Sequence, residues 1–234
     1  MKRYFPNEFT KQEKRWKNKK KDSESKKIRL FSYIYLNHFC SRIERNGKGR
    51  IIPYKNAVID LEKGSQIRIE DENICIGVNK LKKSKTETYV RLRENAVWDA
   101  KKGCEISYGS TIEILKNAEL ESKYFTMNNF STLVSAKKII LGEDVMIARN
   151  AVVFDSDFHV IEYDENQAEY SETVSIGDHV WIGANAIILK GVIVGNGSII
   201  AANTVVTKNV EQGVMVGNEK KLCVLKENVR WRRA

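Results

Sequence analysis

Apolar residues recur every six positions along the second half of the chain. Written in sixes from Ile176, the sequence reads IGDHVW, IGANAI, ILKGVI, VGNGSI, IAANTV and VTKNVE. The first position is always Ile or Val, and the fifth is always small or β-branched. Neither the helical period of 3.6 nor the strand period of 2.0 produces a repeat of six. A short strand followed by a tight corner does produce it, with the first aliphatic residue inward and the small fifth residue at the crowded corner.

Three such strands close a triangular coil of about eighteen residues, and stacked coils form a solenoid with continuous buried rungs. The same register extends upstream through residues 141–158 and becomes degenerate before them. We therefore expect an all-β fold, a parallel β-helix over residues 51–218. The tail, residues 219–234, is expected to form a short helix or arm over the last coil.

The positive charge of the chain is concentrated at its N-terminal end. The formal charge is +10, and residues 1–50 contain 16 Lys and Arg against 5 Asp and Glu. The remaining residues contain 24 basic and 25 acidic side chains. This distribution indicates a basic arm on a nearly neutral body. We expect no nucleic-acid partner for the body.

A helix is predicted near the end of this arm, over about residues 27–45. Its apolar residues at helical spacing are Ile28, Phe31, Tyr35, Phe39 and Ile43. Two interpretations stay open: this face caps the end of the body, or it contacts an anionic membrane surface peripherally. The apolar run is too short to span a bilayer, and the first residues lack the apolar segment of a signal peptide. We expect a cytoplasmic protein, with peripheral membrane contact as the second interpretation.

The six-residue rhythm breaks at DSDFH, residues 155–159, where Asp155, Asp157 and His159 alternate. In extended chain Asp155 and His159 would lie about 13 Å apart, so one metal ion could not bind all three side chains. The register places Asp157 at an inward fifth position, where an unpaired carboxylate is costly. We therefore predict that the chain leaves the coil here and forms a loop over about residues 155–175.

Three segments carry a resemblance to a known family: IARNAVVFDSDFH, IGDHVWIGANAIILKGVIVGNGSIIAANTVVTKNV and GNEKK. They resemble the hexapeptide-repeat acyltransferases, in particular the bacterial capsule and lipopolysaccharide O-acetyltransferases. The resemblance implies a left-handed β-helix, acetyl-CoA as the acyl donor and no metal. It also implies a homotrimer with active sites between neighbouring subunits.

The resemblance also assigns roles to individual residues. His159 matches the general base of the family, and a histidine suits that task because its side chain titrates near neutral pH. The positions that match donor contacts are Trp181, Gly183, Ala184, Ala201, Ala202, Thr207, Lys208 and Lys221. Trp181 would lie beside the acyl group. The glycine and the three alanines would lie along pantetheine, because bulkier side chains there would fill the groove between subunits. Thr207, Lys208 and Lys221 would lie at the nucleotide end of coenzyme A. The sequence reads Gly-Asn-Glu before Lys221, where the family commonly has Gly-Asn-Pro.

Three polar residues remain as candidates for the acceptor side of the site. Asn129 lies close to a family asparagine that contacts the acceptor sugar. Asp155 or Asp157 would orient the imidazole of His159 or hold the acceptor, and the sequence does not choose between them.

The resemblance therefore implies an O-acetyltransferase that moves an acetyl group from acetyl-CoA to a hydroxyl of a surface-polysaccharide sugar, and we expect direct transfer with His159 as base. An N-acyltransferase acting on a nucleotide-linked amino sugar and a non-catalytic solenoid scaffold remain as alternatives. The zinc carbonic anhydrases that share this fold need three histidines on neighbouring coils. The three histidines here are 121 and 20 residues apart, which disfavours that class.

Overall fold

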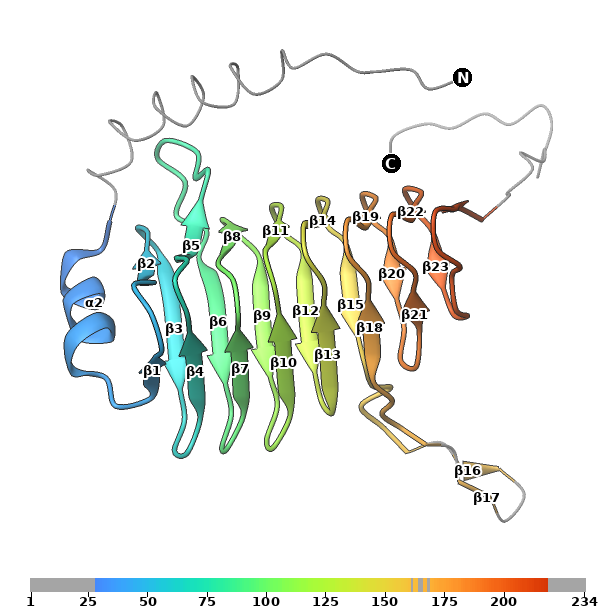
Figure 1. Ribbon diagram of the computed structural model, residues 1–234, viewed down its shortest axis with the longest axis horizontal. Coiled ribbons are helices and arrows are strands. Elements are labelled where there is room, and N and C mark those ends of the chain that lie inside the picture. Colours follow the sequence, from blue (N-terminus) through green and yellow to red (C-terminus); the bar gives the residue numbers. More distant parts are fainter. Residues whose placement is uncertain (1–27, 161, 164–165, 168, 219–234) are drawn as a thin grey trace, which may run out of the picture.

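The computed structural model describes residues 28–160, 162–163, 166–167 and 169–218. Within them the chain winds into a solenoid whose strands pair in parallel with strands one coil before and one coil after (Figure 1). The arm before residue 28 and the predicted C-terminal arm, with Lys221, lie outside the described residues.

Three parallel sheets form the three faces of the solenoid. Face 1 contains β1 (Ile43–Arg45), β4 (Gln66–Ile69), β7 (Val97–Ala100), β10 (Glu119–Ser122), β13 (Lys138–Leu141), β18 (Val174–Ile176) and β21 (Ile193–Val194). Face 2 contains β2 (Ile51–Pro53), β5 (Ile74–Val78), β8 (Cys104–Ser107), β11 (Phe125–Met127), β14 (Val145–Ile147), β19 (Trp181–Ile182), β22 (Ile199–Ile200) and β24 (Met215–Val216). Face 3 contains β3 (Ala57–Leu61), β6 (Thr88–Leu92), β9 (Thr111–Ile114), β12 (Thr132–Ser135), β15 (Val152–Phe154), β20 (Ile187–Ile188) and β23 (Val205–Val206).

One passage over faces 1, 2 and 3 is a coil, so coil 1 runs from β1 to β3 and coil 5 from β13 to β15. The three parallel sheets match the left-handed parallel β-helix that the sequence predicts.

The six-residue repeat forms the core as predicted. The aliphatic first positions from Ile176 to Val206 are at most 5% exposed, and the small fifth positions are at most 7% exposed. The parallel register places Ile182 beside Ile200 and Ile188 beside Val206. Burial of each such side chain contributes about 1.5–3 kcal/mol, so stacking of like residues stabilises every coil through its neighbours.

A short helix closes the N-terminal end of the solenoid. It consists of α2 (Leu30–Ile34), which continues as the π-helical turn η2 (Tyr35–Phe39). The buried Asn37 side chain donates a hydrogen bond to the Ile51 carbonyl (2.7 Å) and accepts one from the Ile51 N–H (3.0 Å). The amide thereby pairs the N–H and C=O groups of Ile51, which a neighbouring strand would otherwise pair at the edge of β2. The predicted helix is too long, and coil 1 starts before residue 51, because Ile43 already pairs with Ile67.

The helix closes the end of the body as the first interpretation expects, and Ile43 of the expected face is buried, but Phe31, Tyr35 and Phe39 are not buried against the body. Their exposed fractions are 88%, 52% and 73%. Leu36 and Cys40 are buried instead, because the hydrogen bonds of the Asn37 side chain turn that side of the helix toward the coil. Among the described residues, no helix has the length and apolar character to cross a membrane.

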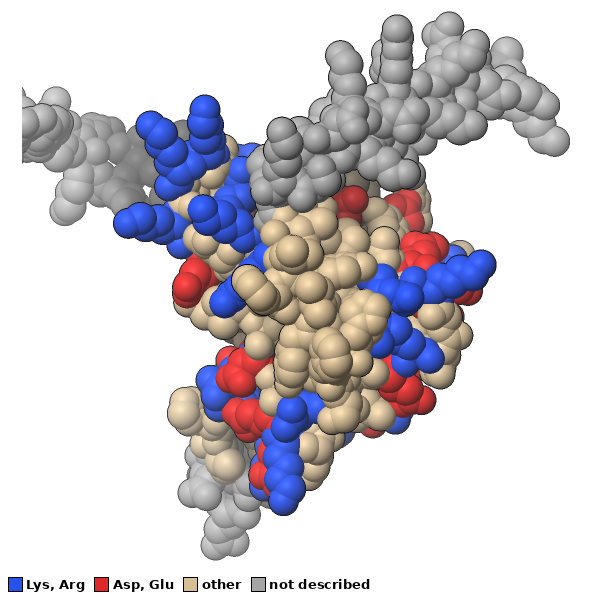
Figure 2. Space-filling model, turned by 90° about the vertical axis from the view of Figure 1, so that its left-hand side faces the viewer, with Lys and Arg blue, Asp and Glu red and all other residues tan. Residues whose placement is uncertain are grey.

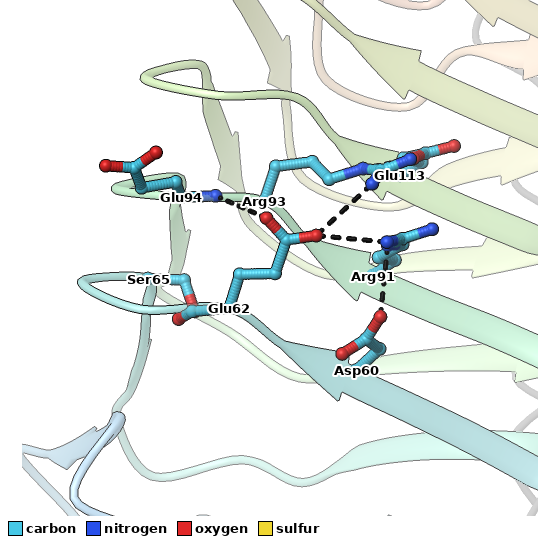
Figure 3. A network of polar contacts seen from close by, with 7 residues as sticks. All are labelled: Asp60, Glu62, Ser65, Arg91, Arg93, Glu94 and Glu113. Atoms are coloured by element: carbon cyan, nitrogen blue, oxygen red, sulfur yellow. Dashed lines mark hydrogen bonds and ion pairs between the residues drawn. The ribbon is translucent and has the colours of Figure 1, made fainter.

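A polar network ties the first three coils together at the corner between faces 3 and 1 (Figure 3). Arg91 and Arg93 both donate to one oxygen of Glu62, at 3.0 and 3.2 Å, and the Glu94 N–H donates to the other at 3.1 Å. Arg93 also donates to Glu113 on the next coil, at 2.8 Å. Partial burial raises the pKa of the Glu62 carboxyl, but these hydrogen bonds outweigh burial and leave the pKa below its usual value.

Acid is therefore expected to destabilise the folded chain through such carboxyls. A carboxyl with a lowered folded pKa contributes fully above its usual value, 4.5 for Glu62, and its contribution is lost as pH falls through the folded pKa. We expect Glu62→Gln to lower Tm at neutral pH and to reduce the further fall on acidification to about pH 3. Scanning calorimetry across this range checks the result. Glu44→Gln, which removes an exposed pair with Arg68, is the control and should keep the wild-type pH dependence.

Candidate active site

A long loop leaves the solenoid at the corner between faces 3 and 1, after β15 and before β18. It replaces the short corner that other coils have there, and it contains the antiparallel pair β16 (Glu162–Tyr163) and β17 (Asn166–Gln167). Figure 1 shows this hairpin projecting away from the solenoid. The predicted loop over about residues 155–175 coincides with this excursion.

Asp155 fixes the base of the loop. Its side chain is fully buried and accepts hydrogen bonds from the Ser135 hydroxyl (2.8 Å), the Ala136 N–H (2.6 Å) and the Lys137 N–H (2.9 Å). The carboxylate thereby provides the acceptor for the hydrogen-bond donors at the corner of the coil below. The predicted inward position of Asp157 is wrong by two residues, because β15 continues its in-and-out alternation through Asp155. The Asp155 carboxylate is shielded from solvent and makes no hydrogen bond to His159.

Asp157 and Lys190 fix the two limbs of the loop to the following coil. The Lys190 ammonium lies 2.6 Å from an Asp157 carboxylate oxygen and also donates to the Glu169 carbonyl. The Asp157 N–H donates to the Tyr170 carbonyl at 2.8 Å. Both side chains of the ion pair are largely shielded, with 20% of Lys190 and 32% of Asp157 exposed. Lys190 was not among the residues expected from the sequence.

His159 stands at the outer end of this fixed base. The residue before it, Phe158, has a φ of +61° and packs edge-on against Phe154, with ring centroids 5.2 Å apart. His159 is exposed, and its imidazole makes no hydrogen bond or ion pair with any other described residue.

Replacing Lys190 by methionine is expected to loosen this loop. Methionine keeps an apolar stem but removes the ammonium, which leaves the partly shielded Asp157 carboxylate unpaired. If His159 is the base, kcat should fall by about tenfold with an unchanged KM for the acyl donor, because the imidazole would be positioned through this anchor. Limited proteolysis of the loop should become faster. Lys116→Met, which removes an exposed pair with Glu94, is the control, and equal proteolysis of the two variants would contradict the anchoring role.

The predicted donor-binding residues gather on face 2 and at the corner between faces 2 and 3. Trp181 is 48% exposed on β19, where a shallow cavity of about 210 Å³ is lined by Trp181, Met146, Ile199, Asp144 and His179 among others. Ile199 was not among the predicted site residues. It pairs with Trp181 one coil later, so the eighteen-residue coil period, counted from Trp181, identifies it as a neighbour.

The small residues stack at the next corner on consecutive coils. The Gly183 N–H donates to the Ile200 carbonyl (2.8 Å), and the Asn203 N–H donates to the Ala184 carbonyl (2.9 Å). A Cβ on Gly183 would lie 2.6 Å from the Ile200 oxygen, so this glycine is required by the close approach of two coils. The close approach of the coils therefore explains Gly183 without a bound ligand, and its predicted donor role stays a prediction. Ala201 and Ala202 follow β22 at the same corner, and Ala202 is exposed.

The remaining candidates lie apart from this group. Thr207 and Lys208 are exposed at the corner after β23, one face further along the chain. Asn129 is buried at the corner between faces 2 and 3 of coil 4, where it donates to the Tyr108 carbonyl at 3.2 Å.

His159 does not meet Trp181 or the stacked small residues within one chain, whereas Thr207 and Lys208 lie at the corner from which the loop leaves, two coils further along. The loop leaves at the corner between faces 3 and 1, and Figure 1 shows it at the opposite edge of the solenoid from the turns that follow β19 and β22. Face 3 separates the two groups.

His179 is the second histidine near the candidate site. Its Nδ1 lies 2.7 Å from an Asp144 carboxylate oxygen, and its φ of +54° is one that tight corners require. The side chain is 81% exposed. The corner conformation favours the structural role that the sequence suggested, and the exposed pair with Asp144 adds little free energy to it.

Known proteins are similar to this chain in repeat and in sequence. Residues 173–208 match the model of the hexapeptide repeat of succinyl-transferase. A putative acetyltransferase of Saccharomyces cerevisiae, YJL218W, is 28% identical over 72% of this chain and 84% of its own length. The galactoside O-acetyltransferase of Escherichia coli is 34% identical over 47% of this chain and 51% of its own length.

A third relative is named for polysaccharide chemistry. The putative lipopolysaccharide biosynthesis O-acetyl transferase WbbJ of Escherichia coli is 24% identical over 44% of this chain. The chain spans 57% of its length, so this match and the galactoside match each cover little more than half of the relative. The repeat match, the three parallel sheets and the named acetyltransferases confirm the predicted resemblance to the hexapeptide-repeat acyltransferases.

Proposed function

We propose that the protein transfers an acetyl group from acetyl-CoA to a hydroxyl of a surface-polysaccharide sugar. The observation that carries this proposal is the exposed imidazole of His159, which has no partner among the described residues and stands on a loop anchored by Asp155 and Lys190. An imidazole in this state accepts the proton of an acceptor hydroxyl as the oxygen attacks the thioester carbonyl. The proton then leaves with the thiolate of coenzyme A, and no covalent enzyme intermediate is needed.

The donor is proposed to lie along Trp181 and the stacked small residues of the neighbouring corner. The exposed indole and the cavity beside it offer an apolar surface for the acyl chain. Ala201 and Ala202 continue this surface by one coil, and Thr207, Lys208 and Lys221 are proposed for the nucleotide end.

We further propose a homotrimer in which the loop of one copy reaches the donor surface of the next. This arrangement is supported by the separation of His159 from Trp181 in one chain, because a second copy must supply one half of the site. The outward apolar side chains of Met146 and Trp181 on face 2 are compatible with a neighbouring surface. Asp157 and Asn129 remain candidates for contact with the acceptor.

The experiment supplies the full chain with acetyl-CoA and measures free thiol with and without candidate acceptors. A polysaccharide O-acetyltransferase should release coenzyme A only with the glycan and form a product that mild alkali cleaves, because esters hydrolyse and amides do not. An alkali-stable product from a nucleotide-linked amino sugar would instead identify an N-acyltransferase. Absence of thiol release with every acceptor would favour a non-catalytic scaffold.

A further inference from the structure

The helix at the N-terminal end carries an apolar surface that is largely exposed, although Phe31 and Tyr35 also line a cavity of about 360 Å³ with Ala57 and Ile59 of β3. This outer helix face consists of Leu30, Phe31, Ile34, Tyr35 and Phe39, with exposed fractions of 62%, 88%, 39%, 52% and 73%. No Lys, Arg, Asp or Glu occurs between Leu30 and Phe39. Figure 2, which looks onto this end, shows uncharged surface across its middle and a group of Lys and Arg side chains beside it at the upper left. An exposed apolar cluster of this kind marks an interaction site.

The helix cannot rotate to bury this face, because its other side is bonded to coil 1. Both polar atoms of the Asn37 amide bind the Ile51 backbone, and an Arg45 guanidinium nitrogen donates to the Leu36 carbonyl at 2.8 Å. Leu36 and Cys40 pack into the core on the same side. The exposure of the aromatic rings is therefore a fixed property of the fold.

Positive charge accompanies this apolar face. The loop of residues 79–87, between β5 and β6 of coil 2, contains Lys80, Lys82, Lys83 and Lys85. Burial first, and the charge of Lys55 second, lower the pKa of Lys80, so a nearby anion would relieve this repulsion. The sequence that directly precedes the helix, residues 1–27, adds 11 Lys and Arg against 4 Asp and Glu.

We propose that the outer helix face docks on an anionic lipid bilayer. Its aromatic and aliphatic side chains enter the boundary between headgroups and acyl chains, and the lysines of the 79–87 loop lie on the lipid phosphates. A helix with one apolar side next to dense basic charge is the pattern of interfacial membrane binding. A second copy of the same face is a poorer occupant, because it would bring two lysine loops together.

The test measures co-sedimentation of the full chain with vesicles of phosphatidylcholine, alone or mixed with phosphatidylglycerol. We expect binding only to the mixed vesicles, and weaker binding as salt is raised. The double variant Phe31→Ser, Phe39→Ser should lower the affinity by about tenfold or more for each ring removed from the membrane. The double variant Lys82→Gln, Lys85→Gln should lower the affinity for mixed vesicles and make it less sensitive to salt. Lys83 is left unchanged because its φ is +69°. Ile193→Ser, at a 52% exposed residue on the far coils, is the matched control.

Four results would overturn the proposal. The first is equal binding to both kinds of vesicle, and the second is an unchanged affinity of the Phe31, Phe39 double variant. A change in the sedimentation velocity of that variant without vesicles would show that a second copy covers the face. A lower Tm than that of Ile193→Ser, again without vesicles, would show that another segment of the same chain covers it.

Discussion

Replacing His159 by alanine is expected to lower kcat/KM for acetyl transfer by about 10²- to 10⁴-fold, the range that general base catalysis supplies. The loss should appear in kcat with little change in the KM for acetyl-CoA. The reason is that the imidazole is exposed on a loop that leaves the solenoid one face away from Trp181. It would act on the acceptor hydroxyl and not on the binding of the donor.

The fold of this variant should be intact, because an exposed side chain without partners among the described residues contributes little to stability. Circular dichroism and Tm check this point. His38→Ala, at another exposed histidine far from the loop, serves as the matched control and should keep full activity on a soluble acceptor. Wild-type turnover in His159→Ala would remove this residue from the mechanism.

Replacing Asp155 by alanine is expected to reduce both stability and activity. The buried carboxylate accepts three hydrogen bonds, so its removal leaves the Ala136 and Lys137 N–H groups without their acceptor, whereas the Ser135 hydroxyl keeps the Glu119 carbonyl. The cost of such unsatisfied donors is about 1–3 kcal/mol each where water cannot reach them, so the free energy of unfolding should fall by roughly 3 kcal/mol. Urea denaturation measures this change. Activity should fall with it, because the anchored base of the loop positions His159.

The matched control for this substitution is Asp60→Ala, at a carboxylate 52% exposed in an ion pair with Arg91. Its effect should stay within about 0.5 kcal/mol. If Asp155→Ala kept wild-type stability and lost only activity, the carboxylate would act in the chemistry itself.

The sequence predicts the solenoid well where each coil repeats the same six-residue pattern. Ile182 and Ile200 occupy equivalent positions one coil apart, and both are buried, because the repeat is itself the stacking interaction. The earlier coils, which hold larger residues such as Trp98 and a lysine loop, depart from this pattern. The start of coil 1 was therefore placed too late.

The loop shows why the rest could not be predicted from spacing. Asp155 is buried because three donors of the coil below, eighteen to twenty residues earlier, surround it. Lys190 reaches the loop from the coil above. Such contacts depend on how coils with an insertion stack, and a local pattern carries no information about them. Likewise, helical spacing identified an apolar face of the helix. It did not predict that Asn37 would bind β2 and so turn the opposite side of the helix toward the solenoid.

The strand ladder also sets a height scale for the molecule. Neighbouring coils are separated by the strand spacing of about 4.8 Å, and four such steps lie between coil 1 and the coil from which the loop departs. With the helical end resting on a bilayer, the base of the loop would stand about 20 Å above the headgroups. Insertion or removal of one coil between them would move His159 by a single step. On a chain docked in this way, the number of coils before the loop would set how far from the membrane an acceptor is reached.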